Sequence, residues 1–277
     1  MLMPTNFTGR LRQIVQQRNS HLCVGLDPEI EKLPANFPRT PEGVVQFCKE
    51  IINATSESAA AFKINFAFFE ALGSDGWRAL EKVAALLPDN VIRIADAKRG
   101  DIGNSAKQYA RAILQELPFD CVTVNPYLGG DAAAPFLENP EKGAFFLCMT
   151  SNPSAREIQH FPDSSRPLFL HVAARVAEWD VNKNCGLVVG ATHEEELKKI
   201  RQAVDDMPFL IPGVGAQGGD LKISATIGTA NGTIPSLING SRAIIFAGDD
   251  KNFANAAANA AKKFQSDMES AIQESTK

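Results

Sequence analysis

The segment Ile92-Arg-Ile-Ala-Asp96-Ala-Lys98-Arg-Gly-Asp101-Ile-Gly-Asn-Ser105 decides how this chain is interpreted. Its apolar start predicts a buried strand, and apolar residues at helical spacing beyond it predict a helix. Between the two lie the charged residues Asp96, Lys98 and Asp101. Asp96 and Lys98 are two residues apart, so their side chains point the same way along an extended chain. A surface ion pair would explain these charges simply, but their place at the end of an apolar strand favours a functional site equally.

The same alternation of apolar strand and helix recurs along the chain. The strands are apolar throughout, as parallel strands covered on both faces should be. Eight of them predict a single α/β domain, a (β/α)8 barrel over residues 1–277. An open doubly wound sheet is the alternative, but the first turn, Gly25-Leu-Asp27-Pro28, lacks its GxGxxG pattern. The predicted strands are 22–27, 60–65, 91–97, 121–126, 143–151, 186–191, 209–215 and 241–247.

Composition excludes several classes of function. Hydrophobic residues make up 44% of the chain, charged residues 22%, and the net charge is −4, which disfavours nonspecific binding to nucleic acid or anionic membranes. We expect neither a signal peptide nor a membrane span. The five cysteines and four histidines are scattered without metal-binding spacing, so we expect free thiols, no zinc site and a cytoplasmic protein.

In a barrel of this kind, functional residues should follow the carboxyl ends of the strands. The stretch from Gly213 to Gly219 follows the seventh strand, where glycines let backbone N–H groups approach phosphate. Residues 217–235 are rich in Gly, Thr and Ala and are interpreted as a mobile lid. Arg242 lies at the start of the last predicted strand, so either that boundary is misplaced or the arginine belongs to a loop over the mouth. The other candidates at strand ends are Asp27, Lys63, Thr150, Ser151, Gln217 and Ser241.

Each of these candidates also has a purely structural explanation. Lys63 could extend from an apolar strand to solvent, Asp27 could be a turn residue before Pro28, and Ser151 could begin a turn. Taken together, they indicate a barrel enzyme for a small phosphorylated substrate. Proton transfer, decarboxylation and aldol chemistry all remain compatible with this set.

The set as a whole resembles the orotidine 5′-phosphate decarboxylase family, in particular its longer bacterial subgroup. The resemblance rests on Asp96-x-Lys98-x-x-Asp101-Ile102, supported in order by Gly25-Leu-Asp27, Phe62-Lys63, the segment 212–219 and Ser241-Arg242. It covers nearly the whole chain. The DxKxxD triplet alone is shared with related phosphosugar decarboxylases and aldolases, whereas the full set in order is far more specific.

The resemblance implies decarboxylation of orotidine 5′-phosphate to UMP in pyrimidine biosynthesis, without a cofactor and in a homodimer with shared active sites. Lys98 would deliver a proton to the carbon that loses CO2, and Lys63, Asp96 and Asp101 would complete an alternating charge array, with Asp101 coming from the partner subunit. The remaining roles would be ribose binding by Asp27, a pyrimidine contact by Ser151, phosphate binding by Gln217 and Arg242, and lining of the pocket across the interface by Ile102. Ser105 stands where the family usually has threonine, and its hydroxyl keeps a ribose contact possible.

Three other functions stay open at this point. One is a magnesium-dependent phosphosugar decarboxylase or aldolase, in which an acid of the triplet would hold Mg2+. Another is an enzyme that uses Lys63 or Lys98 as a Schiff-base nucleophile. The third is a non-catalytic nucleotide-binding barrel, against which the charge array argues because binding alone does not require it.

Overall fold

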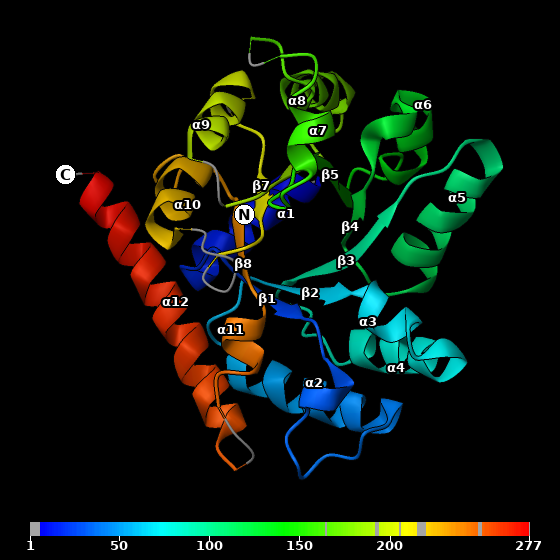
Figure 1. Cartoon of the computed structure of the whole chain (residues 1–277), viewed down its shortest axis with the longest axis vertical. Helices are drawn as coiled ribbons and strands as arrows, with labels where there is room; N and C mark the ends of the chain where they lie inside the picture. The colour runs from blue at the N-terminus through cyan, green and yellow to red at the C-terminus, as the bar shows by residue number, and fades with distance from the viewer. Residues whose placement is uncertain are drawn as a thin grey trace.

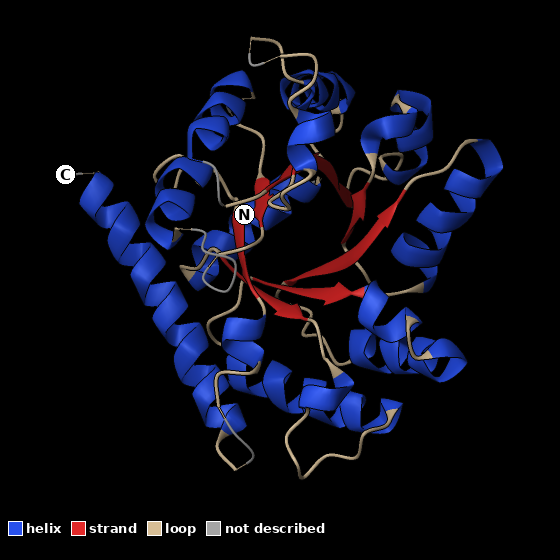
Figure 2. Ribbon diagram, in the orientation of Figure 1, coloured by secondary structure: helices blue, strands red, loops and turns tan. Residues whose placement is uncertain are grey.

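A computed structural model describes residues 6–163, 165–191, 194–204, 206–214, 220–248 and 251–276. Eight parallel strands close into a barrel in sequence order, with β1 pairing with both β2 and β8 (Figure 2). The predicted (β/α)8 barrel is therefore confirmed. The strands are β1 Leu22–Leu26, β2 Ala61–Asn65, β3 Ile92–Arg99, β4 Cys121–Val124, β5 Gly143–Met149, β6 Cys185–Val189, β7 Phe209–Ile211 and β8 Leu237–Gly240.

Helices surround the strands, and the long helix α12 runs along the outside of the molecule (Figure 1). Several begin at the residues that favour a helix start: Asn6 and Thr40 accept hydrogen bonds from the backbone at the starts of α1 and α2. The α-helices are α1 Phe7–Arg18, α2 Pro41–Thr55, α3 Phe66–Glu70, α4 Gly73–Ala85, α5 Gly103–Arg111, α6 Gly130–Ala133, α7 Ala155–Gln159, α8 Leu168–Trp179, α9 Glu194–Ala203, α10 Leu221–Gly228, α11 Arg242–Ile245 and α12 Phe253–Ser275. None of the described helices is long and apolar enough to cross a membrane.

Two separate cores hold the barrel together. The outer core lies between the sheet and the surrounding helices. The inner core fills the barrel, and α1 closes its amino-terminal end, where Phe7 packs edge-on against Phe145 at 6.0 Å between ring centroids. The amide of Phe7 also donates to the carbonyl of Pro140, just before β5. Helix α1 thus closes the amino-terminal end of the barrel.

Along each strand, every second side chain points into the barrel. Near the amino-terminal end these side chains are apolar and belong to the inner core; two residues further along, several strands carry a polar or charged side chain instead. Lys63 follows Ala61, Asp96 follows Ile94, and Thr123 follows Cys121 in this way. Because inward-facing side chains recur at every second residue, this spacing predicts which polar side chains lie together at the mouth of the barrel.

Two predictions about the last third of the chain are wrong. Residues 241–247 are not the last strand: β8 ends at Gly240, and α11 follows it with Ile244 and Ile245 buried. A short apolar run does not by itself distinguish a strand from a buried helical turn. Arg242 is therefore not at the start of a strand; it is the first residue of α11, two positions after the end of β8.

The predicted lid over residues 217–235 is also contradicted for most of its length. Residues 221–228 form α10, whose first turn is capped by the Asp220 carboxylate. Ser224 and Ala225 are buried, and a Cβ at Gly228 would lie 2.1 Å from Ile211 Cδ1, so this helix packs closely on β7. Residues 215–219, including Gln217, lie outside the described residues.

Candidate active site

A chain of alternating charges lies at the carboxyl end of the barrel. Lys98 Nζ is 2.6 Å from Asp96 Oδ1, and Lys63 Nζ is 2.9 Å from Asp96 Oδ2. The same Lys63 ammonium is 3.6 Å from Asp27 Oδ1. The predicted strand-end residues of β1, β2 and β3 therefore meet, and both oxygens of Asp96 are taken up by ammonium groups.

The surroundings keep the inner part of this array ionised. Burial by itself favours the neutral form of Lys63, but the carboxylates of Asp27 and Asp96 outweigh it and raise the Lys63 pKa above its ordinary value. Burial likewise opposes the charge on Asp96, yet the ammonium groups of Lys63 and Lys98 hold the Asp96 pKa well below its usual range. Lys98 differs from both because 51% of its side chain is exposed. It presents a charged donor to the mouth of the barrel.

A cavity of about 190 Å³ opens beside the array. Arg242 and Ser241 border it at the end of β8, and Pro212 to Val214 border it after β7. An arginine beside the loops after strands 7 and 8 stands where barrels often bind phosphate. Asp27, Lys63 and Asp96 line it as well, so one cavity joins the charge array to Arg242.

Three predicted residues follow β3 and form no hydrogen bond or ion pair with the array in the described part of the chain. The Asp101 carboxylate accepts a hydrogen bond from the backbone N–H of Ile102 and forms no ion pair in the described part of the chain. Ile102 is 62% exposed, and Ser105 is exposed in the first turn of α5. Ser151 is half-buried, two residues beyond the end of β5.

Three polar residues of this region were missed by the sequence prediction. Asn65 and Asn239 line the cavity, and Thr123 hydrogen-bonds to Asp96. Asn239 Nδ2 donates to Ser241 Oγ. Thr123 lies two positions after the inward-facing Cys121 of its own strand, so the inward period of two would have found it. Asn239 lies in β8, which the predicted strand over residues 241–247 does not include.

A family model described as orotidine 5′-phosphate decarboxylase / HUMPS matches residues 20–257. The chain belongs to this family. It is 44% identical over 261 residues to the orotidine 5′-phosphate decarboxylase of Herpetosiphon aurantiacus, which covers 93% of this chain and 96% of that relative. The orotidine 5′-phosphate decarboxylase of a Janthinobacterium species is 46% identical over 256 residues, with 91% and 93% covered.

Solved structures of the decarboxylase family have the same fold. A crystal structure described as a putative orotidine-monophosphate-decarboxylase from Toxoplasma gondii superposes with a TM-score of 0.85 at 38% identity. The match covers 96% of this chain and 99% of that one. The predicted resemblance to the decarboxylase family is confirmed by sequence and by fold.

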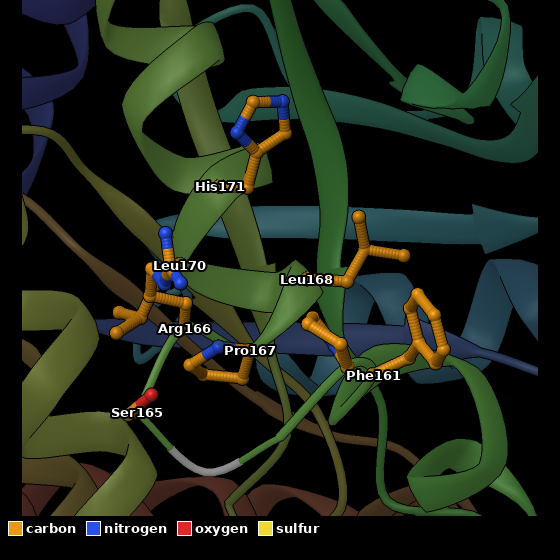
Figure 3. Close-up of a pocket in the computed structure, with 8 residues that line it drawn as sticks. Phe161, Ser165, Arg166, Pro167, Leu168, Leu170 and His171 are labelled. Atoms are coloured by element: carbon orange, nitrogen blue, oxygen red, sulfur yellow. The ribbon is translucent and has the colours of Figure 1, made fainter.

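A second hollow, of about 490 Å³, lies between residues 161–167 and the start of α8 (Figure 3). Its described lining is mainly apolar, with Arg166 and His171 as the cationic or titratable groups and no carboxylate. It therefore lacks the alternating charges on which the decarboxylase assignment rests. Nor do three His, Cys, Asp or Glu side chains gather as metal ligands anywhere in the described ranges.

Proposed function

We propose that this chain converts orotidine 5′-phosphate to UMP and CO2, and that Lys98 protonates the ring carbon that loses CO2. The observation that supports this best is the alternation of Lys98, Asp96, Lys63 and Asp27 at the barrel mouth. Loss of CO2 leaves a carbanion, which a nearby ammonium stabilises and then protonates. The relatives named orotidine 5′-phosphate decarboxylase support this choice of substrate, and the charge array supports the proton transfer.

The proposed decarboxylation needs no cofactor, because every electron pair and proton in it is accounted for by the substrate, Lys98 and solvent. The bond between the ring carbon and the carboxylate breaks, its electron pair stays on the ring carbon, and that pair takes a proton from Lys98 Nζ. Solvent then returns a proton to Lys98 through its exposed side chain. Asp96 holds the ammonium in place and, beside the substrate carboxylate, raises the energy of the ground state.

The remaining groups of the cavity position the substrate. Arg242 and, in the segment outside the described residues, Gln217 bind the phosphate, Asp27 binds the ribose, and Ser151 contacts the pyrimidine. Binding energy from the distant phosphate lowers the barrier at the reacting carbon when it is used to orient the ring.

The functional unit is a homodimer with shared active sites. Asp101 and Ile102 directly precede α5, and the Asp101 carboxylate accepts a hydrogen bond from the Ile102 N–H and not from a lysine of the array. In the proposed dimer, both residues act in the site of the neighbouring copy. Ile102 and Tyr109 are exposed apolar side chains at the start of α5 and within it, and after β4 Tyr127 is 84% exposed and Leu128 is also exposed. Exposed apolar side chains of this size are typical of an interface when they lie together, and a two-fold dimer would complete both sites at once. In it, Asp101, Ile102 and Ser105 complete the partner's pocket.

We assign residues 1–277 to one catalytic domain of pyrimidine biosynthesis that acts in the cytoplasm. The five cysteines are free and buried, which fits a reducing compartment. Burial also raises the pKa of Cys23 to about 12, so this thiol stays protonated at neutral pH.

The test follows orotidine 5′-phosphate by ultraviolet absorbance in excess EDTA, with wild type, Lys98→Ala and the exposed-lysine control Lys82→Ala. We expect rapid conversion by wild type and by Lys82→Ala, and a loss of about a thousandfold or more in folded Lys98→Ala. Near-normal turnover by folded Lys98→Ala contradicts the role of Lys98. Inhibition by EDTA indicates the magnesium-dependent alternative, and trapping by borohydride indicates a Schiff base.

A further inference from the structure

The β3–β4 ladder is interrupted at the catalytic triplet. Ile94 pairs with Cys121 and Ala95 with Val122, but the next pair is Arg99 with Val124. Three residues of β3, from Asp96 to Lys98, therefore face the single residue Thr123 of β4. Lys98 has a φ of 47°, in the left-handed region that side chains with a Cβ rarely adopt. A specific contact is needed to keep Lys98 in this conformation.

The hydroxyl of Thr123 supplies this contact. It accepts a hydrogen bond of 2.9 Å from the backbone N–H of Lys98. It also lies 3.1 Å from Asp96 Oδ1, and because an ionised carboxylate only accepts, the hydroxyl donates to it. Thr123 is 1% exposed, so water does not replace either bond readily. One buried hydroxyl thus ties the backbone of the proton donor to the carboxylate that holds its ammonium.

We propose that Thr123 is a positioning residue for decarboxylation. Its hydroxyl stabilises the left-handed turn at Lys98 and the orientation of Asp96, and so directs Lys98 Nζ at the reacting carbon. The inference rests on the proposed role of Lys98. Without the hydroxyl, the Lys98 N–H loses its acceptor, and a return of β3 to regular pairing would turn the lysine side chain away. Displacement of a catalytic group by about 1 Å can cost about a hundredfold in rate.

The test compares kcat and KM for orotidine 5′-phosphate in Thr123→Val, which keeps the shape, and Thr123→Ser, which keeps the hydroxyl. The matched control is Thr55→Val: Thr55 is equally buried, and its hydroxyl donates to the Ile51 carbonyl within α2, outside the cavity. We expect kcat of Thr123→Val to fall about 10- to 100-fold with KM changed less than about threefold. Thr123→Ser should recover most of kcat, and Thr55→Val should keep it.

Other outcomes overturn the inference. If Thr123→Val keeps the wild-type kcat, or loses stability alone as Thr55→Val does, the hydroxyl has only a structural role. If Thr123→Val does not fold, Thr123→Cys replaces it, because a thiol is a much weaker hydrogen-bonding group of similar size, and the same criterion for kcat applies. A wild-type protein that leaves orotidine 5′-phosphate unchanged refutes the proposed function instead, so the two failures are distinguishable.

Discussion

At the scale of single residues, the site shows why buried charges persist in this barrel. Moving an ion from water into a protein interior is costly unless an opposite charge and hydrogen bonds compensate. Lys63 has two carboxylate neighbours, and Asp96 accepts hydrogen bonds from Lys63, Lys98 and Thr123. Each buried charge therefore stabilises the next, and removing one leaves its neighbours uncompensated.

This coupling predicts how stability depends on pH. The Asp96 pKa in the folded chain lies below its value of about 4 in an unfolded chain. Its contribution to the free energy of unfolding is therefore complete above about pH 4 and is lost as pH falls toward the folded-state pKa. We expect Asp96→Asn to lower the free energy of unfolding by about 3 kcal/mol at pH 7, because two ammonium groups lose their shared partner.

Urea unfolding between pH 3 and pH 7 measures this prediction. The difference between wild type and Asp96→Asn should be constant near neutrality and should shrink below about pH 4. Asp89→Asn is the control, since the Asp89 side chain is 98% exposed and its ion pair with Arg93 lies at the surface. A difference that stays the same down to pH 3 would show that Asp96 is not stabilised by the two lysines.

At the scale of elements, the proposed phosphate-binding end depends on close packing between β1 and β8. Val24 pairs with Gly240, and the next residue of β1 is Gly25. A Cβ on Gly25 would lie 2.0 Å from Ser241 Oγ and 3.0 Å from Asn239 Oδ1. Only a residue without a side chain leaves room for the hydroxyl beside Arg242.

We therefore expect Gly25→Ala to destabilise the fold by about 1 to 3 kcal/mol, because it overpacks a filled site. It should also raise KM more than it lowers kcat, since Ser241 and Arg242 lie at the binding end of the cavity, away from Lys98. Steady-state kinetics and urea unfolding measure the two effects. Adding Ser241→Ala should restore part of the stability by removing the obstructing oxygen, and unchanged stability and KM in Gly25→Ala would contradict the packing argument.

At the scale of the whole molecule, the proposed activity depends on two copies of the chain. The array lies in the mouth, whereas Asp101 and the exposed Ile102 directly precede α5. A dimer with two-fold symmetry would place the Asp101 of each subunit in the site of the other. Activity would then be a property of the pair of subunits.

Mixing two inactive variants tests this prediction. Lys98→Ala and Asp101→Ala should each be nearly inactive, but a mixed dimer contains one site with both residues intact. Random exchange of equal amounts should therefore restore about one quarter of the wild-type rate. Exchange of subunits is verified by mass-tagging one variant, and no recovery after verified exchange shows that Asp101 does not act across the interface.

The amino-acid sequence is sufficient to predict the barrel and most of the charge array. Apolar strands separated by helices have few architectures available, and charges at the carboxyl ends of β1, β2 and β3 are brought together by any closed barrel. Lys63, Asp96 and Lys98 were found for this reason. The predicted strand over residues 241–247 is wrong because a short buried apolar run has no period that distinguishes a strand from a helical turn.

The contacts between strands follow from the three-dimensional fold and cannot be predicted from local sequence. Thr123 bonds to the backbone of Lys98, where the chain is left-handed. Gly25 leaves room for Ser241. Each contact joins residues distant in sequence. Such contacts depend on the register of neighbouring strands, which local sequence preferences do not specify. The sequence therefore names the groups that carry the chemistry, and the closure of the barrel decides how they are held.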